Sequence, residues 1–364
     1  MVYNDFVKNP FTNLTSLFSH GSDSVVGIDF GSSAIKVVQL KKKNGQAVLE
    51  TYGSVALGPY AEVEAGRAAR LPSETLADAL KDVMREAKVT ARACGSAVPA
   101  AESLIAALAL PVRQGEDISR IIPIEARKYI PTPISEVTLD WRVLQKQEGV
   151  SAAESDKTEV LITAVHRDAQ ERLKTVLVSA ELDASFLEIE AFSTVRAAAL
   201  APDGAFGILD IGASASKVSI VDNGVMRDAH TIVRGGQDMT LALSSALGIS
   251  VIEAEEKKRS GNSQNGTQTV SVVLTRILSE AREVFRRYEI HMRRTLQGVF
   301  LSGGGALLAG LSAEAEKTFG APVTIIDPMA RLAAPAFLSP LLARAGPEFA
   351  VAIGAALRRL EEVR

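Results

Sequence analysis

Hydrophobic and polar residues alternate along this chain in a pattern that predicts strands joined by tight turns. The segment 25–40, VVGIDFGSSAIKVVQL, has an apolar run, a turn of glycine and serine, and a second apolar run. This order is typical of two antiparallel strands. The second run leads through Asn44-Gly45 into a third, which continues to Leu57. Because both central residues of a type I′ turn need positive φ, an Asn-Gly pair between alternating runs predicts a hairpin.

The same pattern returns in the second part of the chain. The spacing D-x-G-x-x-x-x-K occurs at Asp29–Lys36 and again at Asp210–Lys217, and comparing 29–38 with 210–219 gives six identical residues. After the second copy, another Asn-Gly pair separates two alternating runs. An internal repeat of this length indicates duplicated units. We therefore predict two homologous halves, each opening with three antiparallel strands, and place their boundary at a turn over 201–204.

Further periodic segments complete an α/β chain. In the first half they predict strands over 93–99, 103–110, 136–144, 159–165 and 186–190, and helices over 73–88, 116–130, 167–180 and 191–200. In the second half they predict helices over 238–248, 250–259, 274–296, 312–319 and 349–360, with a polar flexible loop over 260–269. They also predict an apolar strand that starts at 299 and leads through a triple glycine into a helix, and a strand over 322–326.

Composition narrows the class of protein. The chain has 364 residues, and its net charge of −3 leaves no basic excess to neutralise phosphates, which argues against nucleic-acid binding. Cys94 is the only cysteine, so no intrachain disulfide or cysteine metal cluster is expected, which suits a reducing cytosol. No apolar run approaches the roughly 20 residues of a membrane span, and the N-terminus lacks the layout of a signal peptide. We expect a cytoplasmic protein.

Two interpretations of the N-terminal tail, 1–24, stay open. Asn9-Pro10 can begin a short helix, with asparagine as the N-cap and proline at the first helical position. One face of that helix would carry Phe11, Leu14, Leu17 and Phe18. Such a helix would bind a membrane surface or a partner, but the basic face that usually accompanies this role is missing. The alternative is a flexible tail that is disordered or lies on its own domain.

The two turns that combine an acid with a glycine predict a phosphate site between the halves. Small turn residues let backbone N–H groups approach phosphate oxygens, which a Cβ would obstruct. Asp29 and Asp210 cannot bind phosphate directly, but they can hold Mg²⁺ through its waters, and the metal bridges the phosphates. Lys36 can return a positive charge to the same phosphates. The remaining candidate residues in the two turns are Gly31, Ser32, Ser33, Gly212, Ala213 and Ser214.

A triple glycine, Gly303-Gly304-Gly305, supplies a third element. Without side chains, the backbone can pass close to a flat ring and its sugar, with a helix N-terminus nearby. Each element alone also has an ordinary structural explanation, because a D-x-G after one strand is usually just a turn. Two copies together with the triple glycine favour nucleotide binding. Lys217, taken alone, is expected to be a solvated strand residue.

These three elements, in this order, resemble the phosphate-1, phosphate-2 and adenosine motifs of the actin, hexokinase and DnaK-type chaperone superfamily. The resemblance implies an actin-like fold, in which two duplicated ribonuclease-H-like domains enclose a cleft for ATP and Mg²⁺. The segment 188–200 resembles the first connecting helix, where Glu190 matches the position that often orients the attacking water. The segment 349–357 resembles the last helix, which crosses back to the first half.

A shorter match concerns AEEKK at 254–258. It resembles the helix of the superfamily that contacts ribose and adenine, which suggests Glu255 and Lys258 as ligands. A solvated helix face of acids and bases is the alternative interpretation of the same residues.

One branch of the superfamily fits best. The segment 125–144, EARKYIPTPISEVTLDWRVL, resembles the PilM family, which comprises actin-like inner-membrane assembly proteins of type IV pili. The opening strands resemble the same family, and so do two later segments, VLITAVHRDAQERL and FLSGGGALLAGL. This resemblance covers about 25–364. It implies a flexible tail over 1–24, domain I over 25–204 with a small inserted subdomain at roughly 92–180, domain II over 205–348 with a helical subdomain at roughly 237–297, and a final helix over 349–364 that packs back on domain I.

The family resemblance also implies a function. It predicts an ATP-binding scaffold with at most slow ATPase activity, held at the inner face of the cytoplasmic membrane through its partners. A groove in the first half would take the N-terminal cytoplasmic peptide of a PilN-type membrane protein, and nucleotide would set the conformation. Contacts with other proteins of the pilus platform and self-association are compatible with this role.

Two other functions were weighed on the same fold. The first is an FtsA-like filament-forming membrane anchor of cell division. Such a protein ends in a linker and a basic amphipathic helix, whereas this sequence stops directly after its last predicted core helix. The second is a small-molecule kinase, in which Asp29 or Glu190 would deprotonate a substrate hydroxyl.

Overall fold

The first half is built on a five-stranded sheet with the order β3-β2-β1-β4-β8. We describe a computed structural model, which covers residues 24–110, 117–144, 158–260 and 267–362. The strands are β1 Ser24–Phe30, β2 Ala34–Lys43, β3 Gln46–Ala56, β4 Ala93–Val98 and β8 Asp183–Ile189. β2 is antiparallel to both β1 and β3, whereas β4 is parallel to β1 and to β8. The tail predicted over 1–24 lies almost wholly outside the described residues.

The second sheet repeats this arrangement and extends it. Its eight strands follow the order β13-β12-β9-β10-β11-β5-β7-β6. They are β5 Ser103–Leu110, β6 Val137–Val143, β7 Thr158–His166, β9 Ala205–Ile211, β10 Ser216–Asp222, β11 Val225–Ile232, β12 Gly298–Ser302 and β13 Val323–Ile325. The strands β11-β10-β9-β12-β13 match β3-β2-β1-β4-β8 in order and in direction. The predicted duplication is therefore confirmed.

Both predicted Asn-Gly hairpins are present. Asn44 and Gly45 have φ of 52° and 78°, and Asn223 and Gly224 have φ of 49° and 71°. These positive values are the ones that a type I′ turn requires. These turns join β2 to β3 and β10 to β11. The acid and the lysine of each repeat face each other in the preceding strand pair, β1 with β2 and β9 with β10.

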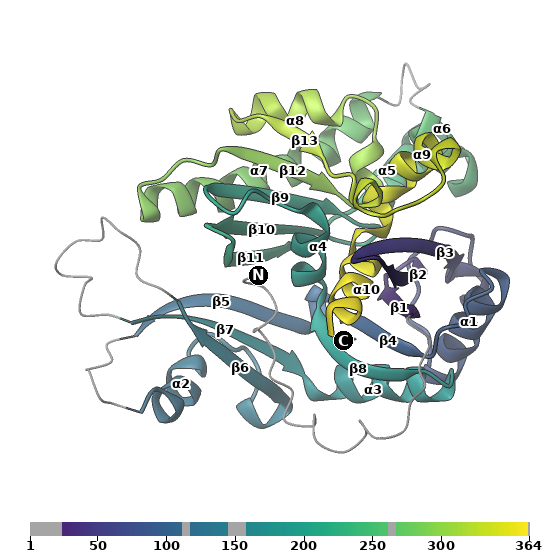
Figure 1. Ribbon diagram of the computed structural model, residues 1–364. Coiled ribbons are helices and arrows are strands. Elements are labelled where there is room, and N and C mark those ends of the chain that lie inside the picture. The colour runs from purple at the N-terminus through teal and green to yellow at the C-terminus, as the bar shows by residue number, and fades with distance from the viewer. Residues whose placement is uncertain (1–23, 111–116, 145–157, 261–266, 363–364) are drawn as a thin grey trace.

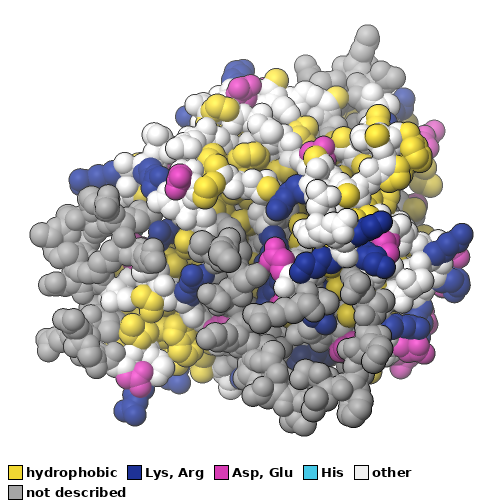
Figure 2. All heavy atoms as spheres, viewed as in Figure 1, with side chains coloured by type: hydrophobic (Ala, Val, Ile, Leu, Met, Phe, Trp, Pro, Cys, Tyr) yellow, Lys and Arg dark blue, Asp and Glu magenta, His cyan; other side chains and the backbone are white. Residues whose placement is uncertain are grey.

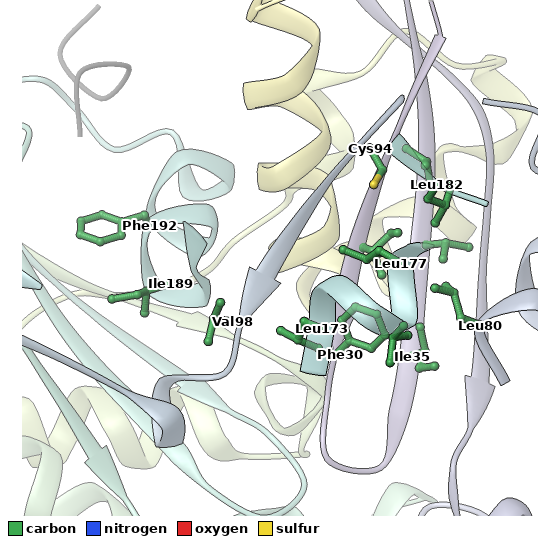
Figure 3. Packing of buried hydrophobic residues seen from close by; sticks show 14 of the residues in the cluster. Phe30, Ile35, Leu80, Cys94, Val98, Leu173, Leu177, Leu182, Ile189 and Phe192 are labelled. Carbon is green, nitrogen blue, oxygen red and sulfur yellow. The ribbon is translucent and has the colours of Figure 1, made fainter. Parts of the chain in front are cut away.

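Helices cover both faces of the first sheet (Figure 1). They are α1 Ser73–Glu86, α3 Arg167–Ser179, α4 Glu190–Ala198 and α10 Ala350–Glu362. The side chains of β1 alternate between two buried faces: Val26, Ile28 and Phe30 lie in one hydrophobic cluster with residues of α1 and α3, whereas Val25 lies in another with residues of α10. Figure 3 shows the first of these clusters around Phe30. Because both faces are buried, β1 is apolar except for Ser24 and Asp29.

The second half carries the helices α5 Gly236–Leu247, α6 Val251–Ser260, α7 Thr267–Met292 and α8 Leu311–Phe319. A short helix, α2 Ile118–Ala126, packs in the cluster of β5, β6 and β7. One further helix, α9 Ser339–Ala345, was missed by the sequence analysis, which predicted nothing between 327 and 348. The predicted loop over 260–269 is shorter in the structure, because α6 includes Ser260 and α7 begins at Thr267, with 261–266 outside the described residues.

The helices α4 and α10 cross at close range near the middle of the molecule. A Cβ on Gly354 would lie 1.9 Å from the Ser193 carbonyl oxygen, so no other residue fits there. Glu188 accepts hydrogen bonds from Arg196 Nη1 at 2.6 Å and from Arg358 Nη1 at 2.7 Å. All three charged side chains are buried. Burial opposes ionisation of Glu188, but the two guanidinium groups hold its pKa below the ordinary value.

For the inserted subdomain, predicted at roughly 92–180, we propose a smaller range. β4 lies inside the first sheet, between β1 and β8, and α3 packs on α1. The chain leaves the first sheet only after β4 and returns at α3. We therefore propose bounds of 99–166 for the subdomain. Residues near the C-terminal end of domain II also contact the first half, where Ala333 forms a bridge with Val48 of β3.

One helical stretch, Ala336–Glu362, is long and apolar enough to be a candidate membrane span by length and composition. This differs from the sequence expectation. Its last part, α10, contacts β1, β2, β4 and α4, and these contacts account for its apolar composition. Its first part is exposed: Phe337 is 81% and Leu341 58% exposed. Figure 2 shows hydrophobic side chains gathered over α9, which lies in this first part.

Candidate functional site

A cavity of about 280 Å³ lies between the two halves, at the ends of the strands that carry the repeated motifs. This volume is close to the lower end of the roughly 300–1,000 Å³ that small-molecule sites occupy. The predicted residues that line it are Asp29, Gly31, Ser32, Ser33, Lys36, Glu190, Asp210, Gly212, Ala213, Ser214, Gly303 and Gly304. A larger cavity of about 470 Å³ lies between the β2–β3 hairpin and the end of α10, and none of the motif residues lines it. The smaller cavity is the better candidate because residues of all three predicted motifs line it.

The register of the two hairpins explains the spacing of the repeated motif. Asp29 lies directly opposite Lys36 in β1 and β2, and Asp210 lies directly opposite Lys217 in β9 and β10. Opposite residues of an antiparallel pair project from the same face. Lys36 Nζ is 3.6 Å from Asp29 Oδ2. Each copy therefore presents one acid and one base to the cavity.

The glycines of the motifs are required by close approaches. A Cβ on Gly31 would lie 2.9 Å from the Ala34 carbonyl oxygen, and one on Gly212 would lie 3.0 Å from that of Ala215. Gly303 has φ of 80°, and a Cβ there would lie 2.6 Å from Asp210 Oδ1. The third element is thus packed directly against the acid of the second, which brings all three motifs to one place.

Burial governs the electrostatics of the two aspartates. It raises the pKa of Asp29 from its ordinary 3.8 to about 6; Lys36 and Lys217 oppose this rise, and Glu190 and Asp210 add to it. Burial likewise raises the pKa of Asp210. Within the described residues, no group of three or more His, Cys, Asp or Glu side chains could hold a metal by itself. Two buried carboxylates with raised pKa values do fit a hydrated cation that also binds phosphate oxygens.

Glu190 is engaged on both of its oxygens. Oε1 accepts a hydrogen bond from the Ala100 backbone N–H at 2.6 Å, and Oε2 lies 3.2 Å from Lys217 Nζ. The prediction that Lys217 is a solvated strand residue is wrong, because its side chain is only 21% exposed and lines the cavity. Burial opposes its charge, but Glu190, Asp210 and Asp29 together raise the pKa of Lys217. Strand alternation could not reveal this partner, which comes from α4.

The triple glycine is divided in its roles. Gly303 and Gly304 line the cavity, whereas a Cβ on Gly305 would lie 2.4 Å from the side chain of Ile211, so this glycine serves packing. The predicted α-helix after the glycines begins only at Leu311. A 3₁₀ helix over Gly304–Leu307 comes first. The triple glycine is therefore followed by a tight turn, and no α-helix N-terminus lies directly after it.

Glu255 and Lys258 contact α5, and neither is among the residues that line the cavity. Lys258 Nζ donates to Thr240 Oγ1 at 2.9 Å and to the Gly236 carbonyl at 3.0 Å, and it lies 2.7 Å from Glu255 Oε2. Burial opposes ionisation of Glu255, but Lys258 and a hydrogen bond from Arg259 lower its pKa to about 2. The pair thus joins α6 to the start of α5.

Several charged residues of the cleft lie outside the predicted motifs. Arg70, Glu102, Arg172 and Glu348 line the cavity, and Glu348 Oε1 is 4.0 Å from Lys36 Nζ. Gln237, which follows Gly235-Gly236, accepts a hydrogen bond through Oε1 from the Ala68 backbone N–H at 2.7 Å, which joins α5 of the second half to a loop of the first. Glu348 directly precedes the helix-like segment 349–357, and its acidic character at that position was the one available signal.

Comparisons with known proteins agree with this architecture. A family model described as type IV pilus assembly protein PilM matches residues 27–360. A solved structure of a PilM-PilN type IV pilus biogenesis complex matches with a TM-score of 0.79 and 26% identity, covering 92% of this chain and 98% of that one.

Two more distant structures share the fold. The ethanolamine utilization protein EutJ from Carboxydothermus hydrogenoformans has a TM-score of 0.54 and 16% identity, over 92% of this chain and 89% of its own. MreB 5 of Spiroplasma citri, solved with AMPPNP, has a TM-score of 0.50 and 14% identity, over 92% of this chain and 95% of its own. The actin-like fold inferred from the motifs is confirmed.

Proposed function

Because the chain belongs to the type IV pilus assembly protein PilM family, we propose that it is an ATP-binding scaffold of the pilus inner-membrane platform. Its partner is the N-terminal cytoplasmic peptide of a PilN-type membrane protein, in keeping with the PilM-PilN complex that it resembles at 26% identity over almost its whole length. The scaffold acts at the cytoplasmic face of the inner membrane, where such a peptide lies.

The observation that carries ATP binding is the convergence of the two repeated hairpins on one cavity. The turns at Gly31 and Gly212 offer backbone N–H groups to phosphate oxygens. Lys36 supplies a positive charge, and Asp29 with Asp210 would hold Mg²⁺ through its waters. When bound, the metal neutralises phosphate charge. The cavity is lined by Asp29, Glu102, Glu190, Asp210 and Glu348 and by Lys36, Arg70, Arg172 and Lys217. Acidic and basic side chains nearly balance, so a divalent cation would offset the negative charge that the phosphates bring.

Several contacts bear on how nucleotide would set the conformation. The chain passes into the second half directly after α4 and returns to the first at α10, and these two helices contact each other. Across the cleft, the Ala68 backbone N–H donates a hydrogen bond to the side chain of Gln237. A ligand that binds both hairpins interacts with both halves and so favours the state in which they are close. This is the basis for a nucleotide-dependent partner surface.

Turnover of ATP is slow in this proposal. A residue that orients an attacking water needs a carboxylate lone pair aimed at that water. Each oxygen of Glu190 already accepts one hydrogen bond, from Ala100 or from Lys217, which leaves one acceptor site on each oxygen. These contacts fix the direction of the remaining sites, so Glu190 would orient a water only where a site faces the nucleotide. The nucleotide then acts mainly as a structural ligand.

A calorimetric titration tests this function. A synthetic peptide with the N-terminal cytoplasmic sequence of a PilN-type protein from the same organism is titrated into the full chain, with and without Mg-ATP. We expect saturable binding whose affinity changes with nucleotide. Asp210→Asn should abolish the nucleotide effect, while Asp203→Asn, at an exposed turn, should preserve it. Absence of peptide binding in both conditions would overturn the pilus role, and Mg-ATP binding unchanged in Asp210→Asn would overturn the site.

A further inference from the structure

The inserted subdomain, 99–166, follows the first half in the chain, yet its sheet joins that of the second half. β5 pairs antiparallel with β11 through Ala106 and Asp228. The described residues of β5, β6 and β7 form no ladder with the five-stranded sheet. Figure 1 shows β5 and β7 continuing the second sheet beyond β11. The subdomain is therefore tied to one half by the chain and to the other by strand pairing.

Apolar packing links the subdomain to both halves. Ile105 and Leu161 belong to a hydrophobic cluster that contains Val221 and Met226 of β10 and β11 and also residues of α1 and α3, so the strand pairing and not this cluster distinguishes the second half. Leu161, Val221 and Met226 are fully buried. Moving the subdomain away from β11 would expose this surface, which opposes separation.

A largely buried ion pair crosses the same boundary. Arg227 Nη1 of β11 lies 3.1 Å from Glu159 Oε2 of β7, so the pair reaches over β5. The Arg227 side chain is only 7% exposed. A buried guanidinium is costly without its counter-charge, so Arg227 holds β7 to the second half. We call the pairing of Asp228 with Ala106 together with this ion pair the subdomain seam.

The entry to the subdomain is connected to the cavity. The chain passes from β4 into the subdomain through a 3₁₀ turn over Ala100–Glu102. The Ala100 N–H donates to Glu190 at 2.6 Å, and Glu190 is paired with Lys217 of the second hairpin. A ligand that displaces Lys217 from Glu190 would therefore disturb the point at which the subdomain begins.

We propose that the inserted subdomain transmits the state of the cleft to the partner surface. The seam makes it move with the second half, so that closure around nucleotide changes its angle to the five-stranded sheet. Arg227 is the positioning residue in this coupling, and it acts through Glu159 without touching nucleotide. This inference rests on the proposed function, because it needs both a nucleotide and a peptide ligand.

The test removes the ion pair while keeping the shapes of its side chains. Arg227→Met with Glu159→Gln is compared with Arg286→Met with Glu283→Gln, a pair of 2.9 Å in α7 whose side chains are about half exposed. The affinity for the PilN-type peptide is measured with and without Mg-ATP in each protein. Hydrogen exchange of the β5 amides, with and without Mg-ATP, gives a second readout that reports the motion itself.

In the wild-type chain and the control, we expect nucleotide to change the peptide Kd by about 5- to 150-fold, the usual range for coupled sites. In the seam variant, this ratio should fall to one while Mg-ATP and peptide each still bind. Adding Ala106→Cys with Asp228→Cys and oxidising should restore the ratio. Opposite residues of an antiparallel pair are about 4.5–5.5 Å apart, a distance that a disulfide spans, and the native Cys94 is buried.

A seam variant that binds both ligands and keeps the wild-type ratio and the wild-type exchange changes would overturn this inference alone. A wild-type chain with a ratio of one would remove the nucleotide-dependent scaffold and the inference together. If the double variant does not fold, Arg227→Met alone serves as the second variant, because it removes the buried charge and leaves only Glu159 unpaired, whose side chain is 29% exposed. It should reduce the ratio, and an unchanged ratio counts against the seam.

Discussion

Replacing Asp29 by asparagine should have opposite effects on ligand binding and on stability. The negative charge of Asp29 would hold Mg²⁺, but the same buried charge destabilises the folded chain. Asp29 is only 6% exposed. Burial raises its pKa to about 6, and the attraction of Lys36 does not compensate. Catalytic and binding sites commonly contain such perturbed carboxylates. We expect Asp29→Asn to be more stable than the wild-type chain at neutral pH and unable to bind Mg-ATP.

The magnitude follows from linkage. The unfolded chain releases the Asp29 proton near pH 3.8, whereas the folded chain releases it near pH 6. Between these values the folded state binds more protons, so stability falls as pH rises. Above the folded pKa the loss is complete, and a pKa difference of about two corresponds to roughly 3 kcal/mol at 1.36 kcal/mol per unit. The raised pKa of Asp210 gives a slope of the same sign.

Urea denaturation at pH 4 and pH 7.5 measures this effect. At pH 7.5 without nucleotide, Asp29→Asn should unfold with a free energy up to about 3 kcal/mol above that of the wild-type chain. At pH 4 the two should converge. Mg-ATP should raise the thermal midpoint of the wild-type chain and leave that of the variant unchanged. Asp78→Asn, at a side chain that is 68% exposed, is the matched control and should change stability by less than about 0.5 kcal/mol at both pH values.

Two outcomes would refute the stability argument, and a third would refute the role of Asp29 in the metal site. A variant that is less stable than the wild-type chain at pH 7.5 would show that the ionised carboxylate is stabilised in the fold, contrary to its raised pKa. A stability difference that is the same at pH 4 and pH 7.5 would show that the effect has no titrating origin. Retained Mg-ATP binding, in turn, would remove Asp29 from the metal site.

Two further predictions concern the crossing of α4 and α10. Gly354→Ala would place a Cβ 1.9 Å from the Ser193 carbonyl oxygen, so we expect the free energy of unfolding, measured by heat or urea, to fall by about 3 kcal/mol or more. The control Gly45→Ala lies in open space and should cost only about 1–2 kcal/mol, because its backbone is left-handed. Equal losses in the two variants would contradict the close crossing. Arg358→Met leaves Glu188 with one guanidinium partner, and we expect the free energy of unfolding to fall by about 3–5 kcal/mol at pH 7. The control Arg286→Met should cost far less. A comparable loss in the control would refute the structural role of the buried pair.

The repeat made much of the fold predictable. Asp29 and Asp210 at equal positions in two similar segments indicated duplication, and local turn chemistry at Asn44-Gly45 fixed the hairpin register. These features are encoded within about ten residues, where backbone preferences decide the outcome. The joining of β5 to β11 could not be predicted, because it depends on one strand pair between segments more than a hundred residues apart, at Ala106 and Asp228.

The candidate site, too, was predicted in part from local sequence and missed where it depends on tertiary contacts. The glycines and aspartates of the hairpins were predicted because their spacing follows from strand geometry. The partner of Lys217 was not, since Glu190 lies on α4, far away in the chain. Lys258 pairs with Glu255 of its own helix, but its contacts with Thr240 and Gly236 of α5 depend on tertiary packing and were not predicted. Glu348 was missed for a similar reason, as a lone acid before a helix carries no periodic signal.

The two lysines of the repeat show how duplicated elements have taken different roles. Lys36 has only the long contacts of 3.6 Å to Asp29 and 4.0 Å to Glu348, so an arriving phosphate can replace them at little cost. Lys217 is held at 3.2 Å by Glu190, the residue that also accepts the Ala100 N–H at the entry to the inserted subdomain. Under the proposed function, nucleotide that binds Lys36 would gain affinity, whereas nucleotide that perturbs Lys217 would change the conformation. The two copies of one hairpin would then serve binding and signalling in the same cavity.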